Sequence, residues 1–191
     1  MPTMPHGFHR SKVHRLFVAA YPPLEASENL LQQARAAADL PGRWTAPEQL
    51  HLTLLFIGET DARQLASVSE SVERACAGLR AFDLSPTRLR TLPERGEIRL
   101  LAVQTDAPPT LLELQRRLVH RLARPAQRAR ADTFLPHLTL VRFPHDARVE
   151  RLDRDLEAQA FRIDRVRLME SHLGQRGASH HEAASFPLEA P

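Results

Sequence analysis

Apolar positions recur along the chain in two patterns, one typical of strands and one typical of helices. Continuous or alternating apolar segments predict strands at residues 14–21, 49–57, 82–92, 98–105, 136–143, 161–173 and 183–188. Apolar residues spaced three and four apart predict helices at residues 22–38, 61–79, 106–122 and 148–159. A turn at residues 93–96 joins two strands into a hairpin, and the helices do not alternate regularly with the strands. We therefore expect an α+β fold with largely antiparallel strands.

Capping and turn residues mark where the predicted elements begin and end. Asp61 and Asp106 stand just before the second and third helices, where a carboxylate can accept hydrogen bonds from unpaired backbone N–H groups, so we expect both to be N-caps. Gly58 is expected to end the second strand and Gly78 the second helix, because glycine readily adopts positive φ angles. Residues 175–178 are expected to form the turn between the last two strands.

The length and composition favour one soluble domain. The chain has 191 residues, of which 42% are hydrophobic and 26% charged, and this is enough to build a hydrophobic core. We expect a flexible N-terminal segment at residues 1–13 and a single domain at residues 14–191. The apolar runs are too short to span a bilayer, and residues 1–12 lack the apolar stretch of a secretory signal. The sequence therefore predicts a cytoplasmic protein without a membrane partner or an evident obligate protein partner.

The cysteine content and the charge distribution narrow the functional classes. Cys76 is the only cysteine, which excludes an intramolecular disulfide and a cysteine-based zinc finger, and its helical spacing from apolar residues predicts core packing. The net charge is +3, and residues 116–130 contain six arginines and no acidic residue. This basic strip could bind nucleic-acid phosphates or form a solvated helix face, and the sequence does not decide between these functions.

The sequence His-Leu-Thr-Leu occurs twice, beginning at His51 and again at His137. Both copies lie on predicted strands, where alternate side chains share a face. Thr53 therefore shares a face with His51, and the leucines point to the other face. Thr139 stands in the same relation to His137. Two such strands facing each other would place two histidines on opposite sides of a phosphate, with two hydroxyl groups to bind its oxygens.

The paired motif predicts general acid–base chemistry on a phosphoester. The pKa of imidazole, about 6.5, allows one histidine to accept a proton from water while the other donates a proton to the departing oxygen. The sequence has no Gly-rich phosphate loop, His-Glu-x-x-His or Gly-x-Ser-x-Gly motif, so it does not support P-loop hydrolysis, zinc proteolysis or esterase chemistry. His180 and His181 with Glu182 are not expected to share a metal ion, because neighbouring residues of a strand point to opposite faces.

The motifs and their surroundings resemble the two-histidine (2H) phosphoesterases, and within them the LigT-like RNA 2′,3′-cyclic phosphodiesterases, formerly named 2′-5′ RNA ligases. The resemblance covers nearly the whole chain and is carried by residues 15–19 (RLFVA), 50–59 (LHLTLLFIGE), 134–142 (FLPHLTLVR) and 168–173 (LMESHL). It implies a bilobal α+β fold, in which two largely antiparallel sheets with flanking helices surround a central cleft.

The resemblance also implies a role for each motif residue. His51 would be the proton donor to the leaving 3′ oxygen, and His137 the proton acceptor that activates water. Thr53 and Thr139 would bind the phosphate, and Arg142 would help to position it. The implied substrate ends in a ribose 2′,3′-cyclic phosphate, as in an RNA end, a tRNA fragment or a small cyclic nucleotide, and is opened to a 2′-phosphate. No metal or other cofactor is implied.

The sequence departs from the family pattern in two places and leaves two other functions open. Residues 97–100 read EIRL where relatives often have Arg-Val-x-Trp, and His180 stands where relatives usually have tyrosine. The same histidines would also serve the reverse reaction, 2′-5′ RNA ligation, and the sequence cannot separate the two directions. The chain could instead be a non-catalytic RNA-binding module that uses the basic strip.

Two aromatic residues, Trp44 and Phe56, flank the strand of the first motif. We expect both to pack in the core, with stacking on a nucleobase as the alternative. The residues that select the physiological substrate lie in loops with no readable pattern, so the sequence leaves the substrate open.

Overall fold

The computed structural model describes residues 13–37, 40–125, 134–174 and 177–190. Its strands are β1 (Val13–Ala20), β2 (Arg43–Trp44), β3 (Leu52–Asp61), β4 (Phe82–Leu84), β5 (Pro86–Leu92), β6 (Leu100–Thr105), β7 (His137–Arg142), β8 (Asp153–Asp155), β9 (Phe161–Ile163), β10 (Arg165–Gly174) and β11 (Gly177–Pro187). Its helices are α1 (Leu24–Ala37), α2 (Leu65–Cys76) and α3 (Pro109–Leu122), with short 3₁₀ helices η1 (Pro47–Gln49) and η2 (Ala62–Gln64). The expected flexible segment, apart from Val13, lies outside the described residues.

The described strands form a large sheet and a small one. Nine strands make up the large sheet, in the order β11-β10-β1-β3-β7-β6-β5-β8, with β2 paired to β7. The other two, β4 and β9, pair with each other. All pairings between these strands are antiparallel. The α+β architecture predicted from the sequence, with largely antiparallel sheets and flanking helices, is confirmed.

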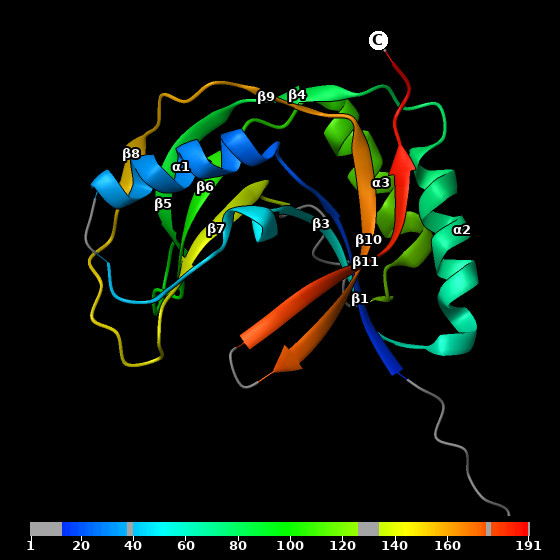
Figure 1. Cartoon of the computed structure of the whole chain (residues 1–191), viewed down its shortest axis with the longest axis horizontal. Helices are drawn as coiled ribbons and strands as arrows, with labels where there is room; N and C mark the ends of the chain where they lie inside the picture. The colour runs from blue at the N-terminus through cyan, green and yellow to red at the C-terminus, as the bar shows by residue number, and fades with distance from the viewer. Residues whose placement is uncertain (1–12, 38–39, 126–133, 175–176, 191) are drawn as a thin grey trace, which may run out of the picture.

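The large sheet is nearly divided in two between β3 and β7. In the described register, these strands are joined by a single residue pair, Leu52 with Leu138. One half contains β11, β10, β1 and β3, and the other contains β7, β6, β5 and β8. Helices α2 and α3 pack together against the first half, whereas α1 is drawn over the second half in Figure 1. The molecule is therefore bilobal, and the two motifs lie at the junction of the lobes.

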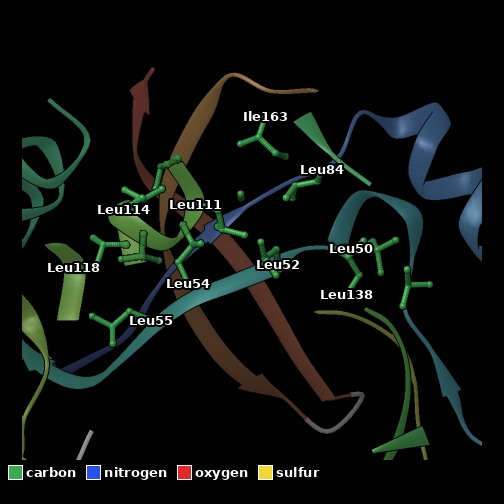
Figure 2. Packing of buried hydrophobic residues seen from close by; sticks show 14 of the residues in the cluster. Leu50, Leu52, Leu54, Leu55, Leu84, Leu111, Leu114, Leu118, Leu138 and Ile163 are labelled. Atoms are coloured by element: carbon green, nitrogen blue, oxygen red, sulfur yellow. The ribbon is translucent and has the colours of Figure 1, made fainter. Parts of the chain in front are cut away.

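The core lies on the leucine side of the two motifs. Leu52 and Leu54 of β3 and Leu138 of β7 are almost completely buried. Strand β3 packs against the apolar side of α3, which buries Leu111, Leu114 and Leu118, whereas Leu138 lies beside Leu50 (Figure 2). Each fully buried leucine contributes roughly 1.5–3 kcal/mol relative to an exposed one. The alternation of leucine with histidine or threonine thus fixes which face of each strand is turned away from the core.

The prediction of a helix at residues 148–159 is wrong. The described structure there is irregular except for the short strand β8, which pairs with β5 at the sheet edge. The carboxylate of Asp153 accepts a hydrogen bond of 2.8 Å from Arg88. Edge pairing supplies backbone hydrogen bonds to a segment whose few apolar residues give a helix little surface to bury, so tertiary context overrides the helical pattern.

Several predicted boundaries also differ from the structure. The strands expected at residues 82–92 and 161–173 are each divided in two, and their first parts, β4 and β9, form the small sheet. The second predicted strand starts at Leu52, because residues 47–49 form η1, and it continues through Gly58 to Asp61. Gly58 has a φ of 88° and lies beside a break in the register with β1. It therefore lies at a bulge inside the strand and does not end the strand. Asp106 does not cap α3: its carboxylate accepts a hydrogen bond from the backbone N–H of Ser85.

Other local predictions are confirmed. Asp61 is an N-cap, although of η2 directly before α2, and Gly78, with a φ of 71°, follows the end of α2. Cys76 is buried in the core. The hairpin of β5 and β6 and the closing hairpin of β10 and β11 both form, and residues 175–176 of the expected last turn lie outside the described residues. Among the described helices, none has the length and hydropathy needed to cross a membrane.

Candidate active site

The two His-Leu-Thr-Leu motifs lie side by side where β3 meets β7. The first leucines of the two motifs are paired antiparallel and buried. Continued by one residue in each direction, the antiparallel register of this single pair would place His51 opposite Thr139 and His137 opposite Thr53. The four side chains predicted from the repeat are therefore carried by the two strands that meet at the junction, on the faces opposite the buried leucines.

Both motif histidines are held in the same way by the backbone. Nδ1 of His51 lies 2.6 Å from the carbonyl oxygen of Gln49, and Nδ1 of His137 lies 2.8 Å from the carbonyl oxygen of Leu135. Because a carbonyl oxygen only accepts, Nδ1 must be the donor in each ring. The other nitrogen, Nε2, is then the proton acceptor of each neutral imidazole. Each histidine is thus oriented by the residue two positions before it.

Each motif strand also contains a β-bulge at the same motif position. The register between β3 and β1 skips Leu54, and the register between β7 and β6 skips Leu140. A bulge adds one residue to a strand and so reverses the alternation of side chains beyond it. Phe56 and Arg142, each five residues after its motif histidine, are thereby turned to the face of that histidine. The two strands are therefore equivalent beyond the four repeated letters.

A cavity of about 610 Å³ opens beside the motifs. Three of the predicted site residues line it, namely His51, Thr139 and Arg142. Thr53 and His137 do not line it. The positive charge of His137 nevertheless lowers the pKa of His51, so the two imidazoles are within electrostatic range of each other. The structure thus brings both motifs to one place, with only part of the predicted set exposed to the cavity.

The described lining of the cavity is cationic. It contains Arg15, Arg43 and Arg142 together with two histidines, and it contains no carboxylate. Arg43 lies directly opposite Arg142 in the register of β2 and β7, an arrangement of like charges that is destabilising by itself. Within the described residues, none of the three arginines forms an ion pair. A bound anion would relieve this repulsion, which favours a phosphate ligand.

The pKa of His51 is strongly displaced. It is lowered from the ordinary value of imidazole to about 4, and burial is the largest cause. The positive charges of His180, Arg142 and His137 contribute to this lowering, and the hydrogen bond to the carbonyl of Gln49 opposes it. His51 is therefore a neutral imidazole at neutral pH when the cavity holds no anion.

His180 is a third histidine in the site, and the sequence did not assign it a role there. Its ring lies edge-on to His51, with 5.1 Å between the ring centroids, and 4.8 Å from the ring of Phe17. Ser171, its register partner on β10, also lines the cavity. Burial lowers the pKa of His180, and the nearby arginine charges lower it further. The neighbouring His181 packs instead on His172, so the side chains of the two adjacent histidines lie in different surroundings.

The two aromatic residues beside the first motif differ in their surroundings. Trp44 is half-buried against the core, as expected, and the guanidinium of Arg35 lies 5.0 Å from the centroid of its ring. Phe56 is 61% exposed, so the expectation that it packs in the core is wrong. Both residues line the cavity. The reason for the difference is the bulge, which turns Phe56 away from the core and cannot be read from the sequence.

The described part of the basic strip is largely engaged by the protein itself. Arg116 and Arg117 both bind the carboxylate of Glu113, and Arg117 also donates to the carbonyl of Ala77. Arg124 donates to the carbonyl of Glu59. The last two arginines of the strip lie outside the described residues. These contacts support a solvated helix face rather than a dedicated phosphate-binding surface.

Comparison with known proteins places these features in context. The model of the 2′-5′ RNA ligase superfamily matches residues 22–175. The chain is 26% identical over 164 residues to the RNA 2′,3′-cyclic phosphodiesterase of Methanothermobacter thermautotrophicus, covering 83% of this chain and 89% of that protein. It is 23% identical over 137 residues to the protein of the same name from Thermotoga maritima, covering 70% and 73% of the two chains.

Solved structures with a similar fold include two bacterial proteins. The crystal structure of TT0787 of Thermus thermophilus has a TM-score of 0.76 at 26% identity and covers 92% of this chain and 98% of that chain. The crystal structure of E. coli LigT in the apo form has a TM-score of 0.75 at 25% identity and covers 93% and 99% of the two chains. The similarity therefore extends over both lobes and includes the junction where the motifs meet.

Proposed function

Because the chain belongs to the 2′-5′ RNA ligase superfamily, we propose that it is an RNA 2′,3′-cyclic phosphodiesterase that opens a cyclic phosphate at an RNA end, or in a small cyclic nucleotide, to a 2′-phosphate. The observation that carries this proposal is the junction of the two motifs, where two imidazoles held alike by backbone carbonyls lie within electrostatic range of each other and His51 lines a cationic cavity. The names of the relatives, RNA 2′,3′-cyclic phosphodiesterases, agree with it.

The proposed reaction is an in-line attack of water on the cyclic phosphate. Nε2 of His137 accepts a proton from the attacking water, and Nε2 of His51 donates a proton to the departing 3′ oxygen. Each proton transfer is expected to contribute about 10²–10⁴ in rate. The hydroxyl groups of Thr53 and Thr139 donate hydrogen bonds to the phosphate oxygens, and Arg142 stabilises the charge that develops on them. The two imidazoles supply both proton transfers, so the proposal involves no metal or other cofactor.

The protonation state of His51 has to change during this cycle. A proton donor must be charged, whereas the pKa of His51 lies at about 4 in the unliganded cavity. A cyclic phosphate carries one negative charge, and a negative charge beside an imidazole raises its pKa. The substrate is therefore expected to bring His51 into the protonated form as it binds. This coupling would restrict the charged, reactive form of His51 to the substrate complex.

The test is hydrolysis of adenosine 2′,3′-cyclic phosphate by the wild type and two variants. His51→Ala and His137→Ala are each expected to abolish production of the 2′-phosphate, while circular dichroism and thermal unfolding show that the fold survives. The matched control is His145→Ala, because the His145 side chain is 83% exposed and does not line the cavity. A chelator is expected to leave the rate unchanged. Full activity in either motif variant would overturn the proposal.

The alternative, 2′-5′ ligation, uses the same groups in the same positions, with a 5′-hydroxyl in place of water. It would join a 2′,3′-cyclic phosphate end to a 5′-hydroxyl end through a 2′-5′ bond, with His137 as the base that accepts the hydroxyl proton and His51 as the acid that protonates the departing 3′ oxygen. Product analysis after incubation with paired tRNA halves separates the two reactions. The non-catalytic alternative, an RNA-binding module on the basic strip, is not favoured, because Arg116, Arg117 and Arg124 are bound to Glu113 or to backbone carbonyls.

A further inference from the structure

Phe56 and Arg15 are among the side chains that line the cavity and that the proposed chemistry does not use. They lie along β1 and β3, beyond the ring of Phe17 as seen from the motif. The ring centroid of Phe17 lies 5.2 Å from that of His51 and 6.1 Å from that of Phe56. The three rings therefore form a row that leads from His51 to the end of the cavity lined by Phe56.

Phe56 is placed in this row by the bulge at Leu54 and not by core packing. It is 61% exposed, although the residues on either side of it, Leu55 and Ile57, are buried. Its counterpart in the second motif strand is Arg142, which lines the same cavity. An aromatic face exposed in a cationic cavity matches the π-face of a nucleobase, since base–aromatic stacking is tolerant of base identity.

Arg15 supplies a charge at the same end of the cavity. Its guanidinium forms no ion pair within the described residues, although Glu59 is its register partner on β3. None of the described residues that line the cavity carries a carboxylate. Arginine binds phosphate oxygens well because its planar group presents several N–H donors. Arg15 and Phe56 together thus offer a charge and a stacking surface, the two groups that single-stranded RNA requires.

We propose that Phe56 and Arg15 form a subsite for the nucleotide that precedes the cyclic-phosphate end. Phe56 stacks on its base, and Arg15 binds the phosphate next to it. A 2′,3′-cyclic phosphate closes the 3′ end of a strand, so the rest of the RNA leaves the reaction site on one side only, and the proposal places it along the row of rings. The inference rests on the proposed function and narrows its substrate class to RNA ends of two or more nucleotides, in preference to mononucleotides.

The experiment compares two substrates, adenosine 2′,3′-cyclic phosphate and the adenylyl dinucleotide with the same cyclic end. The wild type is expected to have the higher kcat/KM for the dinucleotide. Phe56→Ala is expected to lower the ratio of the two kcat/KM values by about tenfold, which is in the range of one lost base–aromatic stack, and Phe56→Tyr is expected to retain it. Arg15→Gln is expected to lower the ratio and to weaken its dependence on salt.

Matched controls lie outside the cavity. Leu112, 46% exposed on α3, is the control for an exposed apolar side chain, and Arg63, 80% exposed, is the control for an arginine. Leu112→Ala and Arg63→Gln are expected to leave the ratio of kcat/KM values unchanged. Equal kcat/KM for both substrates in the wild type, or a ratio that Phe56→Ala does not change, would overturn the subsite.

A binding measurement separates failure of this inference from failure of the proposed function. If the wild type hydrolyses neither substrate, the proposed function is wrong, and the subsite is then tested by calorimetry with adenosine 2′-phosphate and the dinucleotide 2′-phosphate. Tighter binding of the dinucleotide that is lost in Phe56→Ala supports the subsite without turnover. Equal affinity for the two ligands contradicts it.

Discussion

Phe56 and Arg142 occupy equivalent positions in the two motif strands, each five residues after a histidine and each turned into the cavity by a bulge at the fourth motif residue. An unbulged strand would place both side chains on the leucine face, in the core. The two strands thus differ at this position in the chemistry they present, an aromatic ring in one and a guanidinium in the other. Both side chains are therefore targets for substitution without disturbing the core.

Arg142→Gln is expected to reduce kcat/KM on a 2′,3′-cyclic mononucleotide by about 10- to 150-fold. The reason is the loss of a charge-assisted hydrogen bond to the phosphate, which is worth roughly 1.5–3 kcal/mol. Arg142→Lys is expected to restore only part of the loss, because an ammonium cannot reproduce the planar arrangement of donors. Steady-state kinetics check both variants, with Arg63→Gln as the exposed control. Wild-type kinetics in Arg142→Gln would remove this residue from the site.

His51 is expected to make the protein less stable as the pH falls from about 6.5 to 4. The pKa of His51 is about 4 in the folded protein because of its burial, and about 6.5 in an unfolded chain. Between these values the unfolded state binds more protons, so the stability present above pH 6.5 or so is lost progressively as the pH falls through the folded value. The total contribution is on the order of 3 kcal/mol.

Urea unfolding at several pH values measures this dependence. His51→Gln is expected to have a shallower slope of unfolding free energy against pH than the wild type in the range below pH 6.5. His145→Gln, with a largely exposed side chain, should follow the wild type. Parallel curves for the wild type and His51→Gln would show that the pKa of His51 is not lowered. NMR titration with and without adenosine 2′-phosphate should show the pKa of His51 rising when the phosphate binds.

Gly42→Ala is expected to displace β2 from β7 and to weaken activity. A Cβ atom at residue 42 would lie 2.8 Å from the carbonyl oxygen of Arg142 and 2.8 Å from a methyl group of Val141. The backbone φ of 139° adds strain for any residue with a side chain. Gly96→Ala is the matched control: its φ of 81° is also positive, but no described atom lies within 4 Å of the added Cβ.

Both glycine variants are expected to lose roughly 1–3 kcal/mol of unfolding free energy from backbone strain. Only Gly42→Ala should also reduce kcat/KM, because the shift of β2 moves Arg43 and Arg142 apart. Equal kinetic effects of the two variants, measured below their unfolding transitions, would contradict this explanation.

Leu138→Ala is expected to destabilise the protein by about 2–5 kcal/mol, the usual cost of removing a buried leucine side chain. Leu138 is fully buried and, in the described register, contributes to the single pair between β3 and β7. The loss should therefore loosen the contact between the lobes in addition to leaving a cavity. Urea unfolding measures the change, and Leu112→Ala should cost less than about 0.5 kcal/mol because that side chain is exposed. Similar values for the two variants would argue against a structural role for the junction.

The side-chain arrangement within each motif was predictable because it depends on local strand geometry. Alternation along a strand places His51 beside Thr53 and buries the leucines, whatever strands lie next to it. The same alternation predicted that His180 and His181 face different surroundings. Neither result required knowledge of a partner strand.

Other parts of the fold and the site were not predictable, and each failure has a physical reason. The helix expected at residues 148–159 gave way to edge pairing with β5, which depends on residues far away in the sequence. Asp106 is of a residue type that often caps helices, but its carboxylate accepts a hydrogen bond from the backbone N–H of Ser85 instead. Neither Arg15 nor Arg43 was predicted to be a site residue, and both line the cavity because β1 pairs with β3 and β2 pairs with β7.

The amino-acid sequence alone determined the pairing of two imidazoles with two hydroxyl groups, because side-chain alternation is a property of each strand by itself. The folded chain decided how these groups meet: one leucine pair joins the lobes in the described register, and bulges turn Phe56 and Arg142 into the cavity. Register and bulges are set by hydrogen bonding between strands that are distant in the chain, so no local pattern encodes them. The lowered pKa of His51 has the same origin, since it follows from burial and from charges on other strands.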